Sequence, residues 1–420
     1  MSKLQPVRGT HDLLPDDARM HRYVSGLAQY VAMGYGYSEI ITPIFEFSEV
    51  FHRTLGETSD VVSKETYTFE DRGGESITLR PEFTASIARA FISNGLQQHA
   101  PCKFFYTGPA FRYERPQKGR QRQFHQIGVE LLGAAEAQAD IEVIAMAHDI
   151  LTALGLQEYV RLELNSLGDA ESRQVYREAL VAYLQSHKDQ LSPDSQVRLE
   201  RNPLRILDSK APEDQEVIAN APNMHAHFND HSNTFFDTLR DGLNALGISY
   251  TINPHLVRGL DYYSHTVFEF TTDQLGAQGT VLAGGRYDGL IGSMGGPETP
   301  GIGWAAGLER LTSLIAELND EQPLEMPRPI VVIPMNEAMQ MHAVRLAHNL
   351  RKTGFIVEQS YSGNMKKRLK KADKINACAA LIIGEDEITN NAVLLRDLDS
   401  SEQRQVAIND LIEALSNYQQ

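Results

Sequence analysis

Polar side chains that can bind a ligand recur at alternate positions in one stretch of the chain, residues 104–132. Two β-rich runs, Phe104–Tyr113 and Phe124–Leu132, flank a basic loop, and this pattern predicts an antiparallel hairpin. Because alternate residues of a strand point to opposite faces, the predicted polar face carries Ala110, Arg112, Glu114, Phe124, Gln126, Gly128 and Glu130. A glycine between two polar residues would leave room for a ligand against the backbone. A solvated sheet face shows the same alternation, so this pattern alone leaves both interpretations open.

Several separated motifs carry a family resemblance. The hairpin, with the run Phe111–Glu114, resembles motif two of class II aminoacyl-tRNA synthetases, and residues 114–126 (ERPQKGRQRQFHQ) are similar to the histidyl members in particular. Residues 256–263 (LVRGLDYY) and 283–289 (AGGRYDG) resemble the histidine-specific signatures of that family, and residues 301–310 (GIGWAAGLER) resemble motif three. Several motifs in the right order weigh more than any one of them.

The resemblance implies a two-step reaction. L-Histidine would be activated with ATP to histidyl-adenylate and pyrophosphate, and the histidyl group would then pass to the 3′ end of tRNA(His). Mg²⁺ would be bound with ATP, bridging its outer phosphates. Phosphoryl transfer depends on positioning and charge neutralisation, and the planar fork of arginine suits both carboxylate and phosphate oxygens.

The resemblance also implies roles for individual residues. The predicted catalytic residues are Arg112 and Arg258, which would approach the α-phosphate from opposite sides. The predicted histidine-binding residues are Glu82, Thr84, Arg112, Gln126, Glu130, Arg258, Tyr262 and Tyr263. The predicted ATP-binding residues are Arg112, Glu114, Phe124 and Arg310. The predicted contacts to the tRNA acceptor end are Arg115, Gln117, Lys118 and Arg120, of which Arg120 could instead reach phosphates.

Specificity would come from the polar groups around the imidazole. Glu130 would accept a hydrogen bond from one ring nitrogen, and Tyr263 would exchange one with the other. Such a site rejects apolar analogues by a factor of ~10⁴ or more, because they leave its buried groups unpaired. Gly284 and Gly285 would allow a close backbone approach to the ligand, with a plain β-bulge as the alternative.

Composition limits the class of protein. The 420 residues, 42% hydrophobic and 22% charged, are enough for two or three domains with full cores. No apolar run approaches the ~20 residues of a membrane span, and the N-terminus lacks the apolar segment of a secretory signal, so we expect a cytoplasmic protein without membrane contact. The net charge of −16 argues against non-specific nucleic-acid binding. Neither Cys102 nor Cys378 belongs to a CxxC pair, so we expect no zinc and no disulfide.

The elements that would position these residues follow from local patterns. A helix is predicted over 15–33 and a strand over Glu39–Phe45; this pair resembles motif one, which implies a homodimer. A hairpin is predicted across Arg72-Gly73-Gly74, followed by a helix over 85–94. Glu82 and Thr84 would either cap this helix or bind the substrate. On the returning strand of the first hairpin, the core face would carry His125, Ile127, Val129 and Leu131.

The remaining elements complete the predicted domains. A motif-three helix is predicted over 304–318. Arg310 lies beside its apolar stripe, and the alternative to ATP binding is that this side chain snorkels to the surface. Residues 169–247 are charged and helix-prone, and their histidines, His225, His227 and His231, are interpreted as surface residues. Beyond residue 329, strands alternate with helices, and a basic patch would face the tRNA anticodon; it comprises Lys366, Lys367, Arg368, Lys370, Lys371 and Lys374.

The predicted fold class is α+β: a class II antiparallel-sheet catalytic core with a helical insertion, plus a C-terminal α/β anticodon-binding domain. The predicted boundaries are 1–168 and 248–318 for the two parts of the core, 169–247 for the insertion, 319–329 for a linker with three prolines, and 330–420 for the anticodon-binding domain.

Two alternatives remain open at this point. A non-catalytic paralogue of this family serves as a histidine-sensing regulatory subunit of ATP phosphoribosyltransferase, but such paralogues lack the anticodon domain and parts of the catalytic set. This chain keeps Arg112, Arg258 and Arg310 and extends to residue 420. A synthetase for another amino acid is the second alternative, against which the 258–263 stretch, Gln126 and Glu130 argue.

Overall fold

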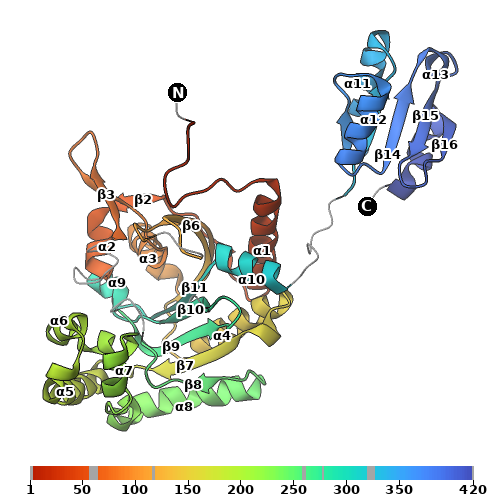
Figure 1. Cartoon of the computed structure of the whole chain (residues 1–420). Helices are drawn as coiled ribbons and strands as arrows, with labels where there is room; N and C mark the ends of the chain where they lie inside the picture. Colours follow the sequence, from red (N-terminus) through yellow and green to blue (C-terminus); the bar gives the residue numbers. More distant parts are fainter. Residues whose placement is uncertain are drawn as a thin grey trace. The chain divides into compact units, whose positions relative to one another are not determined.

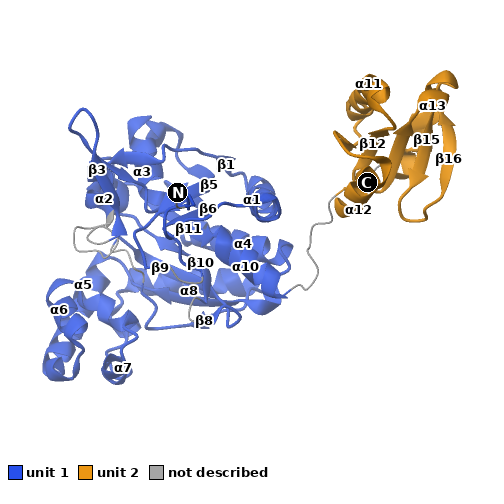
Figure 2. Ribbon diagram, turned by 45° about the horizontal axis from the view of Figure 1, so that its top comes forward, with its two compact units in different colours: residues 1–321 blue, residues 322–420 orange. Residues whose placement is uncertain are grey.

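The computed structural model describes residues 3–55, 65–115, 119–257, 262–276, 279–318 and 327–418. The chain forms two compact units, residues 1–321 and 322–420, shown in different colours in Figure 2. Most of the predicted linker, together with Gln117, Lys118 and Arg258, lies outside the described residues.

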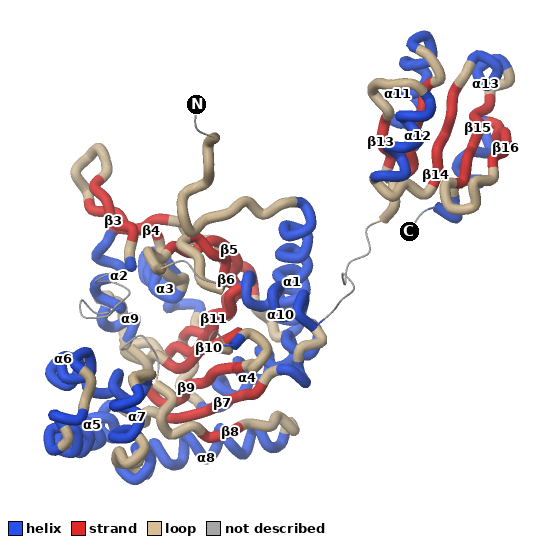
Figure 3. The backbone as a smooth tube through the Cα atoms, viewed as in Figure 1, coloured by secondary structure: helices blue, strands red, loops and turns tan. Residues whose placement is uncertain are grey.

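A large, mostly antiparallel sheet forms the centre of the first unit (Figures 1 and 3). Within the described residues it has eight strands, in the spatial order β1 (Ser38–Glu39), β5 (Cys102–Phe111), β6 (Gln123–Leu132), β11 (Gly301–Gly307), β10 (Thr280–Arg286), β9 (Ser264–Thr271), β7 (Arg161–Ser166) and β8 (Thr251–Ile252). The β1–β5 and β7–β8 pairs at its two edges are parallel, and the other neighbours are antiparallel.

The predicted hairpin is present as β5 and β6. Gly108 lies opposite Gln126 and Phe104 lies opposite Glu130 in the antiparallel register. The first strand ends at Phe111, so Arg112 and Glu114 lie just beyond the sheet.

The core face of β6 is partly as predicted. Ile127, Val129 and Leu131 are buried in the main apolar cluster. His125 is the exception: it is half-buried, and its Nδ1 lies 2.9 Å from a carboxylate oxygen of Glu309, because the start of a helix rather than apolar packing meets this end of the strand.

Helices cover that face of the sheet. They are α1 (Pro15–Gly34), α4 (Ala137–Ala153), α8 (Asp230–Ala245) and α10 (Leu308–Leu318). Their apolar stripes share one cluster with the strands, and the indole of Trp304 donates a 3.1 Å hydrogen bond to the carbonyl of Val143. The predicted start of the motif-three helix at residue 304 is wrong. Residues 301–307 form strand β11, because this glycine- and alanine-rich run fits between β6 and β10.

A small sheet precedes the hairpin. Its strands are β2 (Phe45–Phe47), β4 (Ser76–Leu79) and β3 (Tyr67–Glu70), with helices α2 (Ser48–Leu55) and α3 (Thr84–Ser93) beside it. The β3–β4 hairpin and the α3 helix agree with the sequence prediction. The single strand predicted over Glu39–Phe45 is wrong, because the chain leaves the large sheet after Ile40. There the buried Arg80 guanidinium donates to the carbonyls of Thr42 (3.0 Å) and Pro43 (3.3 Å).

The predicted helical insertion contains α5 (Ala170–Ser186), α6 (Pro193–Arg201), α7 (Pro212–Ile218) and α8. Side chains cap its helices: Asp169, Ser192 and Asn229 each accept a backbone N–H from the first turn. The interpretation of His225 as a surface residue is wrong, since its ring packs on Phe228 and Phe236 and its Nε2 bonds Asn165 at 2.8 Å.

The second unit has, within the described residues, a five-stranded sheet in the order β13 (Val357–Gln359), β12 (Ile330–Pro334), β14 (Ala379–Ile383), β15 (Ala392–Asp397) and β16 (Gln403–Ala407). Its helices are α11 (Gln340–Lys352), α12 (Met365–Lys374), α13 (Glu385–Thr389) and α14 (Leu411–Ala414). β16 and α13 were not predicted, because their sequences are polar. Across the described parts of both units, no helix has the length and apolar character that a membrane span requires.

The predicted basic patch lies on α12 with one exception. Its lysines are exposed, but Arg368 is buried and donates from Nε to the carbonyl of Gly363 at 2.7 Å and from Nη1 to that of Pro334. Arg368 therefore anchors the helix to β12 instead of facing solvent.

Candidate active site

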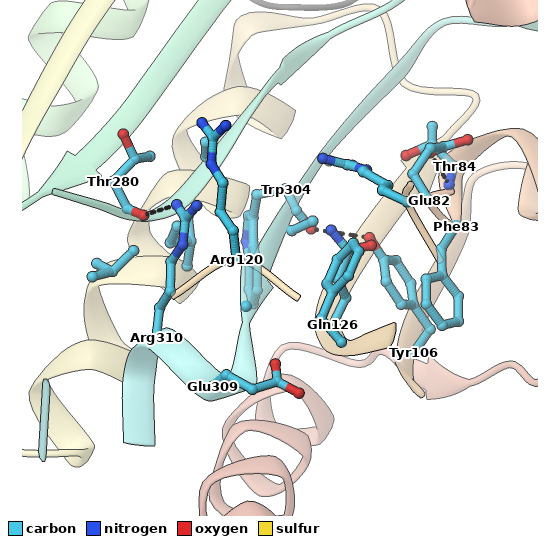
Figure 4. A pocket seen from close by; sticks show the side chains of 18 of the residues that line it. Glu82, Phe83, Thr84, Tyr106, Arg120, Gln126, Thr280, Trp304, Glu309 and Arg310 are labelled. Carbon is cyan, nitrogen blue, oxygen red and sulfur yellow. Dashed lines mark hydrogen bonds between the residues drawn. The ribbon is translucent and has the colours of Figure 1, made fainter. Parts of the chain in front are cut away.

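A pocket lies on the face of the large sheet opposite α1 and α4 (Figure 4). Short segments around β4–α3, β5, β6, β10 and β11 line it. It brings together ten of the residues that the sequence predicts for substrate binding: Glu82, Thr84, Arg112, Glu114, Arg120, Phe124, Gln126, Tyr262, Tyr263 and Arg310. In Figure 4, Glu82 and Thr84 lie at one end of the pocket, and Arg310 lies at the other.

Glu130 is buried below the first end of the pocket. Its Oε1 accepts a 2.7 Å hydrogen bond from the Thr84 hydroxyl, and its Oε2 accepts one from the Tyr287 hydroxyl. Burial raises the pKa of Glu130 to about 8, although both hydrogen bonds lower it. A Cβ on Gly303 would lie 1.9 Å from Oε2, so the glycine in β11 makes room for this carboxylate.

Glu82 sits at the corner between β4 and α3. Its carboxylate accepts the backbone N–H groups of Thr84 (2.6 Å) and Ala85 (2.9 Å), which is the capping arrangement of a helix start. Burial raises the pKa of Glu82, while these hydrogen bonds and the charge of Arg112 lower it. The side chain therefore caps the helix, as one of the two sequence interpretations expects, and it also lines the pocket, where its substrate role stays a prediction.

Gln126 and the two tyrosines close the same end. The Oε1 atom of Gln126 is buried and has no hydrogen-bond partner among the described residues. Tyr262 and Tyr263 lie with their ring centroids 4.7 Å apart. A buried acceptor without a donor is costly, so this atom is suited to receive a hydrogen bond from a bound ligand.

Three arginines line the pocket, from Arg112 beside the Glu82 end to Arg310 at the other end. Arg112 donates from Nε to the carbonyl of Pro81 at 2.9 Å, and its guanidinium carbon lies 5.3 Å from the ring centre of Phe124. Arg120 forms a 3.2 Å ion pair with Glu114. Arg310 donates from Nη1 to the carbonyl of Thr280 at 2.7 Å, so it lines the pocket and does not snorkel to the surface. Three guanidinium groups along one pocket suit a ligand with several anionic oxygens.

Some predicted site residues are not placed in the pocket. Arg258, Gln117 and Lys118 fall outside the described residues, so their roles remain predictions. Arg115 is exposed, and it is not among the residues that line the pocket.

The glycine interpretations need correction. A Cβ on Gly128 would lie 2.2 Å from the Tyr106 hydroxyl and 2.4 Å from the Trp304 carbonyl, so protein atoms, not a ligand, occupy that space. Gly284 would meet the Gly303 carbonyl at 2.2 Å, and Gly285 the Thr266 carbonyl at 2.6 Å. These glycines permit tight strand packing, and a register shift follows Gly285, as the β-bulge alternative expects.

Sequence reasoning gave no role to several residues of the site. The most informative is Tyr287, which holds Glu130; Tyr106 and Trp304 also line the pocket. Tyr287 stands inside the 283–289 signature, so its motif was visible but its contact with Glu130 was not. That contact depends on the pairing of β10 and β6 through β11, which no local pattern encodes.

Family models match almost the whole chain. A model described as histidyl-tRNA synthetase matches residues 9–311, and one described as an anticodon binding domain matches residues 329–418. Among curated relatives, the histidine–tRNA ligase of Rhodospirillum rubrum is 58% identical and covers 100% of both chains. That of Gluconobacter oxydans is 56% identical and covers 99% of both.

Solved structures agree with these matches. The apo histidyl-tRNA synthetase of S. aureus is 35% identical, with a TM-score of 0.83 and coverage of 99% of both chains. The histidyl-tRNA synthetase of Nostoc sp. PCC 7120 is 22% identical with a TM-score of 0.70, a likeness of fold alone. The predicted fold class is confirmed.

Proposed function

The chain belongs to the histidyl-tRNA synthetase family, and from that premise we propose how its residues carry out the family's reaction. It is a class II aminoacyl-tRNA synthetase that activates L-histidine with ATP and transfers the histidyl group to tRNA(His). In the first step a carboxylate oxygen of histidine attacks the α-phosphorus of ATP. The bond from that phosphorus to the bridging oxygen breaks, and pyrophosphate leaves. The observation that carries the proposal is the joint placement of Gln126 and three arginines around one pocket, with Glu130 buried behind its lining and bonded to Thr84.

We assign histidine recognition to the Glu130 end of the pocket. Glu130 and Tyr263 pair with the imidazole nitrogens, while Gln126, Glu82 and Thr84 hold the amino group. The buried, unpartnered Oε1 of Gln126 supports this assignment, since an ammonium group supplies the missing donor. The acidic surroundings support it as well, because Glu82 and Glu130 lie together near that position. Tyr262 packs beside Tyr263 and completes the wall.

We assign the phosphates and adenine to the part of the pocket that runs from Arg112 to Arg310. Arg112 holds the α-phosphate and the histidine carboxylate together, which places the reacting atoms and neutralises their charge. Arg310 and Phe124 enclose adenine, and Arg310 also reaches the outer phosphates. Arg258 approaches the α-phosphate from the far side; this role rests on the family resemblance of residues 256–263.

Mg²⁺ enters with ATP as part of the substrate and neutralises its outer phosphates. Glu114 fits a place beside this ion, because a carboxylate oxygen is the kind of ligand that Mg²⁺ takes. Its Oε2 is buried in the pocket, where it forms the ion pair with Arg120 and no hydrogen bond among the described residues.

We propose that tRNA contacts both units. Arg115, Gln117, Lys118 and Arg120 meet the acceptor end. The exposed lysines of α12 and the match of residues 329–418 to an anticodon binding domain support contact of the second unit with the anticodon. Aminoacylation of tRNA supports a location in the cytoplasm.

We also propose a homodimer formed through motif one. The segment from β1 to β2 exposes large apolar side chains that a monomer would leave in water: Ile41 is 81% exposed, Phe45 55% and Phe47 60%. Sedimentation of the purified chain at several concentrations measures this directly. A monomer at micromolar concentration would contradict the proposal.

The regulatory-subunit alternative is not favoured. The curated relatives that match the full length are named histidine–tRNA ligases. A solved protein from Bacillus halodurans C, named as an ATP phosphoribosyltransferase regulatory subunit/histidyl-tRNA synthetase, is 21% identical and shares the fold alone.

The decisive experiment is ATP–pyrophosphate exchange with Mg²⁺, without tRNA, run with each amino acid separately. We expect exchange with histidine alone. Exchange with another amino acid would overturn the assignment of the Glu130 end. A folded protein that binds histidine without any exchange would restore the regulatory alternative. The Arg112→Ala variant supplies the control, because it should lose exchange while keeping its fold.

A further inference from the structure

A second cluster of polar side chains shares Glu309 with the lining of the pocket and has no part in the proposed reaction. It joins His21 from α1, His125 from β6 and Glu309 from the first turn of α10. One nitrogen or oxygen atom from each side chain lies within 4.8 Å of those of the other two. These three residues are separated by more than a hundred positions in the sequence, so no spacing motif marks them.

The geometry suits a small cation. The Nδ1 atom of His125 lies 2.9 Å from Oε1 of Glu309. Two ligand atoms that each lie about 2.1 Å from one ion are about 3 Å apart at a right angle and about 3.4 Å apart in a tetrahedron. The His125–Glu309 separation is a hydrogen bond in the free chain, and the carboxylate also accepts the backbone N–H of His125 at 2.9 and 3.0 Å. An ion would take the place of the Nδ1 proton while the two ligand atoms kept about the same separation. A ring nitrogen of His21 lies within 4.8 Å of both atoms and would supply the third ligand.

The buried position of His21 is an independent indication that a group outside the protein chain binds here. It is 9% exposed, and its Nδ1 atom is buried without a hydrogen-bond partner among the described residues. Its ring meets that of His125 edge-on, with centroids 5.4 Å apart. A buried imidazole nitrogen without a partner is unfavourable unless something absent from the protein chain binds it.

We propose that His21, His125 and Glu309 bind a divalent transition-metal ion of the zinc type. Two histidines and one carboxylate are a known zinc ligand set that leaves a coordination position for water. The expectation of no zinc was based on cysteine spacing, and a site without cysteine ligands cannot be recognised in that way. The ion would tie α1 to the strand and helix that carry Phe124 and Arg310. In Figure 4, the Glu309 carboxylate points away from Arg310, so this ion would be distinct from the Mg²⁺ of ATP.

The test measures metal binding by the full-length chain, stripped with a chelator and titrated with Zn²⁺ in the absence of ATP. We expect one equivalent per chain and a rise in melting temperature. Changes in groups that only support metal ligands lower metal affinity about 10- to 100-fold, so we expect His21→Gln to lower Zn²⁺ affinity at least as much. His148→Gln is the matched control, because His148 lies on α4 beside Asp149 and outside the cluster.

Two outcomes would overturn the proposal. One is a wild-type chain that takes up no Zn²⁺ at micromolar concentration. The other is a His21→Gln variant that binds Zn²⁺ as tightly as the wild type, which would place the ion elsewhere. Co²⁺ substitution in the unaltered chain adds a readout that does not depend on the folding of a variant. Nitrogen and oxygen ligands should give visible absorption bands, and their absence from a Co²⁺-saturated chain would also count against the site.

Discussion

Two buried carboxylates in the first unit, those of Asp140 and Glu130, differ in the partners that surround them. Asp140 on α4 is fully buried, and so is Arg286 on β10, whose guanidinium binds it through Nε at 3.1 and 3.2 Å and through Nη2. Glu130 is equally buried, but the described residues give it only the hydroxyls of Thr84 and Tyr287. Burial by itself would lower the pKa of Arg286, but Asp140 and Asp288 more than offset it and raise that pKa. Asp140 therefore has a positively charged partner within the chain, whereas Glu130 has only hydroxyl partners among the described residues.

This difference separates structure from function. A buried charge with its counter-charge in the same chain holds elements together, here α4 against β10. A buried charge without one is unfavourable in the free protein and becomes favourable when a ligand brings the partner. We therefore propose that Arg286 stabilises the framework of the sheet and that Glu130 provides its specificity.

The largest expected effect, on the free energy of unfolding, comes from breaking the ion pair between Asp140 and Arg286. Replacing Arg286 by methionine leaves Asp140 charged and buried, which should lower the free energy of unfolding by about 3–5 kcal/mol. Urea denaturation measures this loss. The matched control is Arg161→Met, because Arg161 forms an ion pair with Asp273 in which both side chains are more than half exposed. That change should cost less than about 1 kcal/mol. Equal losses in the two variants would remove the distinction drawn for Asp140.

The next largest effect, on histidine affinity, comes from replacing the carboxylate of Glu130. Glu130→Gln should weaken histidine binding by about 1.5–3 kcal/mol, because glutamine cannot supply the ionised carboxylate that would accept a hydrogen bond from the imidazole in the complex. Calorimetric titration with histidine measures this, and ATP affinity serves as the internal control, since Glu130 lies at the other end of the pocket from Arg310. Unchanged histidine affinity would refute the role of Glu130.

The pH dependence of stability sharpens the comparison further. The folded pKa of Glu130 is about 8, above the ordinary 4.5, so the folded chain keeps a proton that the unfolded chain releases. The stability that this proton provides is fully present below pH 4.5 and is lost as pH rises through 8. The loss is about 1 kcal/mol per pH unit within that window. Urea denaturation across this range should show the slope as a difference between the wild type and Glu130→Gln, and parallel curves would contradict it.

The sequence predicted one of these carboxylates and not the other. Glu130 lies in a motif and on the polar side of an alternating strand, so a ligand role could be argued from local pattern. Asp140 is one acidic residue on an amphipathic helix and carries no local signal; its partner, Arg286, is 146 positions away. The same limit applies to Tyr287 and to the cluster around His21. Strand identity and helix position follow from periodicity, whereas contacts between distant segments depend on sheet order, which periodicity does not fix.

The smallest effect tests the hydroxyl that now holds Glu130. In Tyr287→Phe the carboxylate loses one donor, so histidine affinity should fall by about 1 kcal/mol, or roughly fivefold. Because the Tyr287 hydrogen bond lowers the pKa of Glu130, its loss should also move the pH window of the stability difference upward. Tyr106→Phe is the control, since the Tyr106 hydroxyl lies 3.5 Å from the Trp304 carbonyl and is not hydrogen-bonded to Glu130. It should leave that window in place. If both variants shift the window alike, general packing of the pocket sets the pKa of Glu130, and the specific bond from Tyr287 does not.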